Sequence, residues 1–473
     1  MNNNKERQEK PILLQKLMEL LRQHQSIFKQ ERIYHRVVGL VLAELFAFGR
    51  HTVTQLLLVL GITDDDWSAW YRLFSHQRFQ EKKAARVVLG AVLAEIPAGQ
   101  PFVTGFDGFQ VPRTSRKMPG SSWLKALGTA PFKPGLHRAQ RFVEGSWLTP
   151  LEQGYSRAIP IRCLPAFTAK AVASPAPYCK EWEAGGRYLS WLRREMDQLG
   201  RAEQRILALA DGSFDRIGMW EVLAERVDLV VRTARNRALF QLPEQTIGPG
   251  RPAKYGAKAP APHYWLRQRK EFKIKKVLVR GRERRMRYRV KGPFVRDGLP
   301  DIPVFLLVIG GGKRPSGSRR KQYKPCFFLV SAVQKDGQWQ LPLPLIDLLA
   351  WLWQRWELEV AHREMKSALG LGEKQCWNAH ASILAVQWSA WVYAILVLAG
   401  YQAWGLFGGM QPPGRWRFHS QRWSFNTLWR GYRASFWQQS DFRASWTPTR
   451  DNWLKKEPFF AALNNSVIAA SRA

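Results

Sequence analysis

The chain has 473 residues, of which 45% are hydrophobic and 12% aromatic, so it is long enough for about three domains and can bury a sizeable core. Lys and Arg total 73 against 37 Asp and Glu, a formal net charge of +36. This hydrophobic content excludes a disordered basic tail, so the charge lies on a folded surface. We expect a polyanionic partner, most commonly nucleic acid, with an anionic membrane surface as the alternative.

The cysteines and the N-terminus point to a reducing compartment. The four cysteines form no Cys-x-x-Cys pair, which argues against a zinc site and a disulfide framework. They are Cys163, Cys179, Cys326 and Cys376. The first residues lack the apolar stretch of a secretory signal peptide, so we expect an intracellular, cytoplasmic protein.

Residues 11–98 are predicted to be helical, because leucines recur there at helical spacing. Within this region, residues 52–60 and 64–74 form two short segments around a glycine turn. We expect Thr63 to cap the second helix and Asp64, Asp65 and Asp66 to fill its first turn. A DNA-binding helix-turn-helix is one interpretation; an ordinary helical hairpin is favoured, since acidic residues at that end would repel a DNA groove.

From residue 101 the pattern changes to short apolar runs bounded by turn residues. Strands are predicted at 102–106, 140–148, 158–164, 205–210 and 227–232, with helices at 180–199 and 219–226. Further strands are expected at 304–309 and 326–333, followed by one long helix at 343–369. This order predicts a mixed α/β fold and suits an RNase H-like sheet with flanking helices.

Two segments are unusually basic. Residues 267–291 hold thirteen Lys or Arg against two Glu, and residues 273–280 and 287–291 are predicted to pair as a β-hairpin across residues 281–284. Such density exceeds what protection of an exposed sheet edge requires, so we favour contact with a DNA backbone over a solvated edge hairpin. Residues 108–142 contain seven basic and no acidic residues, and they are interpreted as a phosphate-facing loop or a generic solvated one. The candidate DNA-contacting residues in these segments are Arg113, Arg116, Lys117, Lys273, Lys275, Lys276, Arg285, Arg287 and Arg289.

Two C-terminal features allow more than one interpretation. Residues 381–400 are long and apolar enough to span a bilayer, but Gln387 and Ser389 interrupt them, and a buried core helix is favoured over a membrane anchor. Residues 415–450 interleave tryptophan with arginine, which suits either packing of a terminal subdomain or base stacking and phosphate contact.

Three carboxylates occupy positions that suit a metal site. Asp107 and Asp211 each end an apolar run and are followed by a glycine, and Glu359 lies on the long predicted helix. If neighbouring strands and this helix bring the three together, their oxygens suit Mg²⁺, which can activate water and stabilise a leaving oxygen in phosphodiester cleavage. On the same helix, Arg355, Glu359, Arg363 and Lys366 fall on one face, which a structural salt-bridge ladder would also explain.

The spacing of Arg355, Glu359 and Lys366 resembles the R(3)E(6)K part of the Y(2)R(3)E(6)K signature of IS4-type DDE transposases, whose catalytic core is RNase H-like. Asp107 and Asp211 resemble the first two acids of that triad. The signature's tyrosine falls at Leu352, so its role is unassigned here, and Glu357 is a competing carboxylate that the spacing rejects.

This resemblance implies a bacterial, nucleoid-associated enzyme that cleaves transposon ends and joins them to target DNA. Asp107, Asp211 and Glu359 would hold Mg²⁺, with Mn²⁺ as a substitute, and Arg355, Arg363 and Lys366 would contact DNA. The partners would be double-stranded DNA and a second copy of the chain, without a membrane. A transposase-derived DNA-binding protein without catalysis, or a membrane-anchored basic protein, are the alternatives.

The expected organisation follows from the same comparison. Residues 1–98 form a helical region for DNA binding or dimerisation, and residues 99–235 form the first part of the catalytic core. A basic, β-rich insertion occupies residues 236–303, the second part of the core follows at 304–400, and residues 401–473 form the Trp/Arg-rich end.

Overall fold

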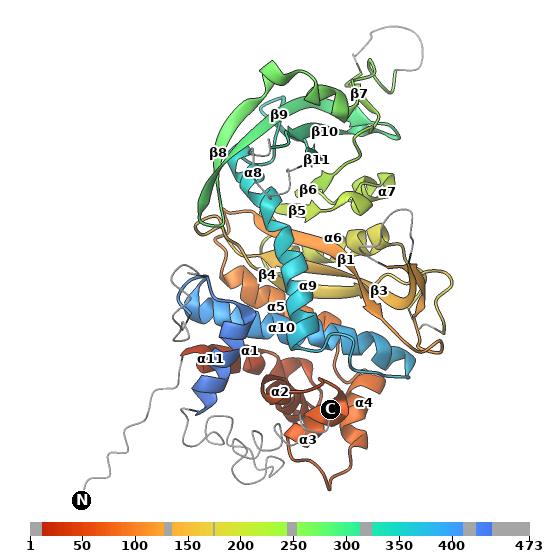
Figure 1. The fold of residues 1–473 in the computed structure, drawn as a ribbon, viewed down its shortest axis with the longest axis vertical. Coiled ribbons are helices and arrows are strands. Elements are labelled where there is room, and N and C mark those ends of the chain that lie inside the picture. Colours follow the sequence, from red (N-terminus) through yellow and green to blue (C-terminus); the bar gives the residue numbers. More distant parts are fainter. Residues whose placement is uncertain are drawn as a thin grey trace, which may run out of the picture.

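The fold is that of a computed structural model, which describes residues 12–126, 135–173, 176–243, 253–312, 324–409 and 422–437. The molecule is elongated, with a group of helices at one end, a large sheet in the middle and a long β-hairpin at the other end (Figure 1).

The N-terminal region is helical, as predicted. It contains α1 (Ile12–Gln23), α2 (Glu31–Phe46), α3 (Val53–Val59), α4 (Ser68–Ser75) and α5 (Glu81–Ala94). The leucines of α1 that recur at helical spacing are all buried. The start predicted for α4 was wrong, because the helix begins four residues later than the Asp64 expected. Asp66 precedes it and accepts a hydrogen bond from the Ser68 backbone amide at 2.8 Å, so Thr63 does not cap this helix.

The described strands form one eleven-stranded mixed sheet and a separate two-stranded one. The first eleven are β1 (Phe102–Pro112), β2 (Ser122–Lys125), β3 (Leu136–Leu148), β4 (Ala158–Pro165), β5 (Ile206–Ala210), β6 (Val227–Arg232), β7 (Leu239–Gln241), β8 (Lys273–Val279), β9 (Arg282–Arg296), β10 (Leu299–Ile309) and β11 (Cys326–Ser331). Their order is β2-β3-β1-β5-β6-β11-β10-β9-β7, with β4 also paired to β3 and β8 to β9. The small sheet pairs β12 (Val333–Lys335) with β13 (Gln338–Gln340).

The central register places two of the candidate acids side by side. Strands β1 and β5 are parallel, and their last paired residues are Gly105 and Leu209. Asp107 and Asp211 each follow two residues later, so they occupy matching positions just beyond the paired segment. The predicted end of the first strand at residue 106 was wrong, because Asp107 lies within β1. Strand β5 ends at Ala210 whereas β1 continues to Pro112, which leaves this edge of β1 open.

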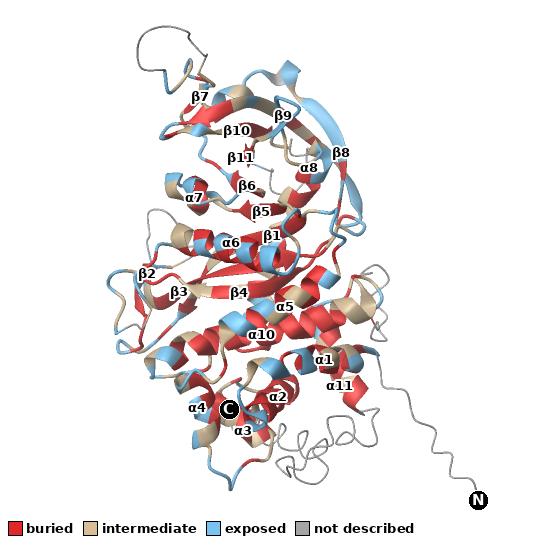
Figure 2. Ribbon diagram, turned by 180° about the vertical axis from the view of Figure 1, so that it is seen from behind, coloured by how far each residue is buried: buried red, intermediate tan, exposed pale blue. Residues whose placement is uncertain are grey.

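Helices cover both faces of this sheet. Helix α6 (Glu181–Gln198) packs against β3, β4 and β1, and α7 (Ile217–Glu221) lies beside it (Figure 2). Helix α9 (Trp356–Ala368) crosses the opposite face, because Leu358 packs on Gly105 while Phe106, the next residue of β1, packs on Gly185 of α6.

The single helix predicted at 343–369 was wrong, because the structure divides it into α8 (Leu345–Gln354) and α9 at Arg355. The two halves pack on different supports. Helix α8 lies against β8, and the Trp353 indole nitrogen donates to the Met286 sulfur of β9 at 3.4 Å, whereas α9 lies against β1 and β4. Arg355 therefore stands at the junction between the hairpin and the central sheet.

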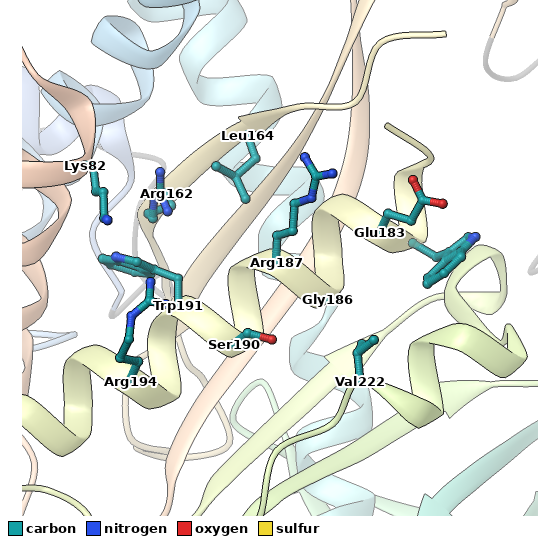
Figure 3. Close-up of a pocket in the computed structure, with 11 residues that line it drawn as sticks. Lys82, Arg162, Leu164, Glu183, Gly186, Arg187, Ser190, Trp191, Arg194 and Val222 are labelled. Carbon is teal, nitrogen blue, oxygen red and sulfur yellow. The ribbon is translucent and has the colours of Figure 1, made fainter. Parts of the chain in front are cut away.

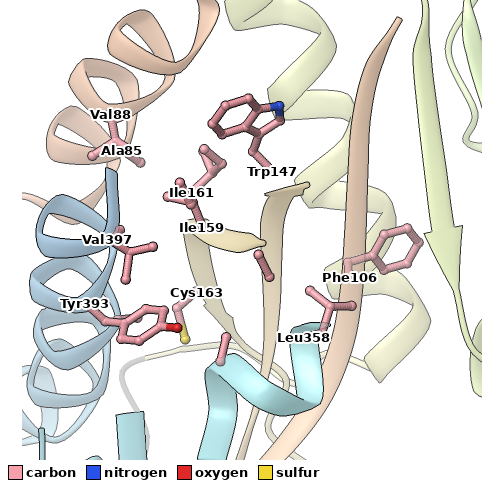
Figure 4. Packing of buried hydrophobic residues seen from close by; sticks show 14 of the residues in the cluster. Ala85, Val88, Phe106, Trp147, Ile159, Ile161, Cys163, Leu358, Tyr393 and Val397 are labelled. Carbon is pink, nitrogen blue, oxygen red and sulfur yellow. The ribbon is translucent and has the colours of Figure 1, made fainter. Parts of the chain in front are cut away.

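The apolar segment near the C-terminus forms α10 (Ala379–Trp404), which is long and apolar enough to cross a membrane by length and composition. In the structure, 89% of its most apolar window is buried. It packs against α1, α5 and β4, where Val397 and Tyr393 face Ile159, Ile161 and Cys163 (Figure 4). Its interrupting glutamine also has a partner, since Gln387 donates to the Cys163 carbonyl oxygen at 2.8 Å. This burial agrees with the core helix that was favoured.

The predicted basic hairpin is present as β8 and β9. Its turn is tighter than expected, with Arg280 and Gly281 both at positive φ, 52° and 68°. Such a two-residue turn follows the twist of the strands, and glycine adopts the left-handed conformation without steric cost. Strand β9 continues into pairing with β10 and β7, so the hairpin extends the same sheet as the central strands.

The described part of the Trp/Arg-rich end packs against the rest of the chain. Helix α11 (Phe425–Trp437) carries Trp429 and Arg433, and both donate to the Leu45 carbonyl oxygen at 2.7 Å. Trp423 is buried. Of the two interpretations, packing of a terminal subdomain therefore accounts for Trp423, Trp429 and Arg433. Residues 410–421 and 438–473 lie outside the described part of the chain.

Candidate active site

The candidate site lies where the parallel pairing of β1 with β5 ends, and three elements contribute to it. Asp107 lies in β1, Asp211 directly follows β5, and Glu359 lies in the first turn of α9. One guanidinium links two of them, since Arg355 donates through Nη1 to Asp107 Oδ2 at 3.0 Å and through Nη2 to Glu359 Oε1 at 2.9 Å. These side chains are half-buried, with 16% of Asp107, 26% of Arg355 and 35% of Glu359 exposed. The site is therefore accessible and partly shielded from water.

The surroundings of Asp107 affect its ionisation. Burial raises the pKa of Asp107, and the Asp211 carboxylate raises it further, while Arg355 and His362 oppose both effects. Backbone amides hold both carboxylates, since Asp107 Oδ1 accepts from Gly108 and Asp211 Oδ1 from Ser213, each at 2.8 Å. Asp107 and Asp211 thus place two carboxylates close enough to interact, and a bound cation would stabilise their negative charge.

The residue types fit a hard divalent cation. Carboxylate oxygens are the ligands that Mg²⁺ prefers, and Asp107, Asp211 and Glu359 provide them. Within the described residues no group of three His, Cys, Asp or Glu side chains is already gathered closely enough to hold a metal ion. Arg355 lies between Asp107 and Glu359, so metal binding between these two requires the guanidinium to move aside.

Glu357 belongs to a different environment from Glu359. Its carboxylate is buried, with 1% exposed, and pairs with Arg422 at 2.6 Å and Arg280 at 3.3 Å. Residues two apart on a helix point in different directions, and here Glu357 joins α9 to the hairpin turn and to the segment before α11. It is thus a structural carboxylate.

Sequence reasoning missed a buried ion pair beneath Asp107. Glu144 lies opposite Asp107 in the β1–β3 register and is fully buried, and its Oε2 is 3.3 Å from Nε2 of His362 on α9. Burial lowers the pKa of His362, but Glu144 and Asp107 outweigh that effect and the pKa is raised. The position of His362, three residues after Glu359, would have placed it on the neighbouring part of the helix surface.

A fourth carboxylate, Glu181, was also missed. It begins α6, and its Oε1 lies 1.6 Å from where a Cβ on Gly108 would stand, so the carboxylate rests directly against the backbone next to Asp107. Burial raises the pKa of Glu181, Arg141 lowers it, and Asp211 and Asp107 raise it. The absence of a side chain on Gly108 permits this approach.

The other predicted residues of α9 lie further along the helix. Arg363 is exposed. Lys366 is also exposed, although partial burial of its amine lowers its pKa. Both follow the side of α9 that begins with Arg355 and Glu359. The structure thus carries cations along the helix away from the three acids.

The loop predicted for residues 108–142 was wrong, because the segment contains the end of β1, the whole of β2 and the start of β3. Its cations divide into buried and exposed ones. Arg113 is buried and donates to Gln140 at 2.9 Å and to the Gly372 carbonyl oxygen at 2.7 Å, so its guanidinium supports the fold. Arg116 and Lys117 are exposed. Residues 127–134 of this segment lie outside the described part of the chain.

The hairpin divides in the same way. Lys273, Lys275, Lys276 and Arg285 are exposed. Arg287 is half-buried over the Phe272 ring, and Arg289 is buried beside the same ring and 3.4 Å from Glu271. The turn reaches the central sheet region, because the Arg280 amide donates to the Gly154 carbonyl oxygen at 2.8 Å. The exposed cations therefore extend from a turn anchored near α9.

A cavity of about 530 Å³ lies on the α6 face of the sheet, away from Asp107, Asp211 and Glu359 (Figure 3). Four cations line it: Lys82, Arg162, Arg187 and Arg194. The Arg162 guanidinium lies over the Trp191 ring at 4.7 Å and pairs with Glu81 at 2.9 Å. The cavity adds to the positive surface and contains none of the three acids.

Comparison with known proteins identifies the family. The model of the DDE superfamily endonucleases matches residues 26–293, more than half of the chain, and the chain belongs to this family. The match includes Asp107 and Asp211 and ends before Glu359. Among solved structures, the chain is similar to a piggyBac transposase in a synaptic complex with hairpin DNA, at 10% identity and a TM-score of 0.40, over 96% of this chain and 82% of that one. No curated protein matches it.

Proposed function

We propose that the protein is a DDE transposase that cleaves DNA at the ends of its element in a Mg²⁺-dependent reaction and joins the 3′ ends to target DNA. The observation that carries this proposal is the grouping of Asp107, Asp211 and Glu359 at one edge of the sheet, where a single arginine joins Asp107 to Glu359. Membership of the DDE superfamily endonucleases supports the same chemistry.

An RNase H-like core is part of the proposal. Strands β4, β3, β1, β5 and β6 follow one another across the sheet, with β3 antiparallel to its neighbours and β1, β5 and β6 parallel. The IS4-type assignment rests on Arg355, Glu359 and Lys366, whose spacing fits the signature of that group, although Leu352 replaces its tyrosine.

Asp107, Asp211 and Glu359 would hold the divalent ions, which supply activation of the attacking water and stabilisation of the leaving oxygen. The chain's own groups position the DNA. Arg355 pairs with Asp107 and Glu359, and its guanidinium, displaced from them, would suit a bidentate contact with a phosphate. Lys366 and Arg363 would continue this contact along α9.

Binding of DNA would rest on exposed cations beyond the three acids. The hairpin residues Lys273, Lys275, Lys276 and Arg285, with Arg116 and Lys117, form the proposed backbone-contacting surface. Arg113 and Arg289 are left out of it, because both are buried. Since two element ends must be joined, a homodimer on DNA in the bacterial cytoplasm completes the proposal.

The test uses a plasmid that carries the reading frame with its native flanking DNA. Purified full chain in Mg²⁺ should cut at the boundaries of the element, and Asp107→Asn or Asp211→Asn should abolish cutting while DNA binding in Ca²⁺ persists. Glu203→Gln is the control, because that carboxylate is 87% exposed and precedes β5, at the opposite end of this strand from Asp211. A wild-type chain that binds the plasmid without cutting it would instead support a transposase-derived DNA-binding protein.

A further inference from the structure

We infer that the cavity of about 530 Å³ on the α6 face of the sheet binds the phosphate backbone of a second DNA duplex, the target to which the cleaved ends are joined. This inference rests on the proposed function and deepens it, because joining requires the ends and the target to be held at the same time. Neither the three-acid motif nor the family match assigns a role to this cavity.

The cavity lies on the opposite face of the sheet from α9. Helix α9 lies in front of the sheet in Figure 1, and α6 lies in front of it when the molecule is seen from behind in Figure 2. Glu181, the first residue of α6, rests against Gly108, and the lining residues of this helix follow from Trp182 to Arg194. DNA that lies along α6 would therefore approach Asp107 from the face opposite α9.

Three cations of the cavity have no acidic partner. Lys82 of α5 and Arg187 and Arg194 of α6 are exposed, and within the part of the chain that the structure describes none of them forms an ion pair. The arginine next to Arg194 differs, since Arg193 is buried and pairs with Asp197 at 2.7 Å. The unpaired cations of α6 thus line the cavity, where an anion from outside the chain can neutralise them.

The cavity is built around Trp191, which is only 2% exposed. The Arg162 guanidinium lies over this ring at 4.7 Å and donates to both carboxylate oxygens of Glu81, at 3.2 and 2.9 Å. Figure 3 shows the side chains of Lys82 and Arg194 pointing toward the same ring from two helices. Arg162 therefore holds the indole in place, and the free positive charge around it comes from Lys82 and Arg194.

The spacing of the cations suits a repeating polyanion better than a single phosphate. Arg187 and Arg194 are seven residues apart on α6, which corresponds to about 10 Å along the helix axis. In Figure 3 their side chains lie apart and do not converge on one point. A DNA strand carries one phosphate for every ~3.4 Å of duplex axis, so its backbone can contact both arginines.

The first experiment measures how a random-sequence duplex binds to the full chain that is already saturated with a fragment carrying an element boundary. Replacing Lys82, Arg187 and Arg194 together by Gln should reduce the slope of log K against log salt by roughly 0.9 for each phosphate that is no longer neutralised. Since all three side chains are exposed, this triple variant should melt as the wild type does.

Two control variants accompany this measurement. Glu183→Gln removes the charge of an acid that lines the cavity and can still accept the capping hydrogen bond from the Lys180 amide, so it should bind the second duplex more tightly. Lys335→Gln removes an exposed cation that does not line the cavity and should bind it as the wild type does.

The second experiment follows the reaction in Mg²⁺ with the plasmid that carries the native flanking DNA and a separate target plasmid. In the triple variant the fraction of cleaved ends that are joined to the target should fall by roughly tenfold or more, because charge-assisted contacts with phosphates are lost. A loss of cleavage in the same proportion as joining would place the element end in the cavity and overturn the inference.

The remaining outcomes separate this inference from the proposed function. Unchanged second-duplex binding and joining in the triple variant would exclude the cavity from the DNA surface and leave the proposed function intact. Loss of ATP binding with unchanged DNA binding would assign the cavity to free nucleotides and likewise overturn the inference. If the wild type binds both duplexes without cleaving, the proposed function is wrong, while weaker second-duplex binding by the triple variant still supports the cavity as a DNA surface.

Discussion

The acidic edge of the sheet and the basic hairpin carry opposite charges and are held in opposite ways. Asp107, Asp211 and Glu359 are half-buried and fixed by strand register, backbone amides and Arg355. The exposed lysines of β8 lie on a strand that is fixed mainly at its turn and at its pairing with β9. Chemistry at a phosphate requires fixed oxygens, whereas affinity for a phosphate backbone requires exposed charge. Changes in the two regions should therefore alter different measurements.

The largest effect is expected in the hairpin. Replacing Lys273, Lys275, Lys276 and Arg285 by Gln should reduce the slope of log K against log salt by roughly 0.9 for each DNA phosphate that is no longer neutralised. The control replaces Ile274 and Leu278, exposed apolar residues of the same strand, by Gln and should leave the slope unchanged. Equal slopes in the charge variant and the wild type would remove the hairpin from the DNA surface.

The next largest effect is a difference in stability between variants of Glu357 and Glu359, the two glutamates in the first turn of α9. Glu357→Gln leaves Arg422 and Arg280 without their buried partner and should lower the free energy of unfolding by about 3 kcal/mol. Glu359→Gln changes a more exposed group and should alter stability far less. Urea denaturation measures both, and a greater destabilisation by Glu359→Gln would contradict the division between structural and catalytic carboxylates.

Arg355 pairs with Asp107 and Glu359, two carboxylates that would also bind the metal ion. It therefore competes with the metal for both groups. Arg355→Ala should raise the affinity of the DNA-free protein for Mn²⁺ by roughly fivefold, equivalent to about 1 kcal/mol for a partly exposed ion pair. Cleavage of DNA should nevertheless fall. Calorimetry that shows no metal binding in a folded Arg355→Ala protein would make this arginine part of the metal site.

The smallest expected effect is a pH dependence of stability that arises from the pair formed by Glu144 and His362. The pKa of His362 is raised in the folded protein, so its charged form contributes stability that is complete below the unfolded value of about 6.5 and is lost as pH rises through the folded value. The difference in unfolding free energy between wild type and His362→Gln should therefore shrink from pH 6 to pH 9. A difference that grows over this range would show that the histidine is neutral.

The sequence allowed much of this to be predicted because the relevant patterns are local. Apolar runs ending at Asp107 and Asp211 predicted the strands, and the spacing from Arg355 to Lys366 singled out Glu359 over Glu357. The break of the helix at Arg355 could not be predicted, because it follows from two halves that pack on different strands. The same holds for Glu181 and Glu144, whose proximity to Asp107 arises from sheet pairing and from the approach of α6. The burial of Arg113 and Arg289 depends on partners far along the chain or on the packing of one aromatic ring.

The most direct test of the account is the effect of Glu359→Gln on cleavage of the plasmid that carries the reading frame and its flanking DNA. Glutamine preserves volume and removes the charge that would hold a hard cation. We expect the variant to bind this DNA in Ca²⁺ as the wild type does and to lose Mg²⁺-dependent cleavage by orders of magnitude. Cleavage at the wild-type rate by a folded Glu359→Gln protein would contradict the three-carboxylate site.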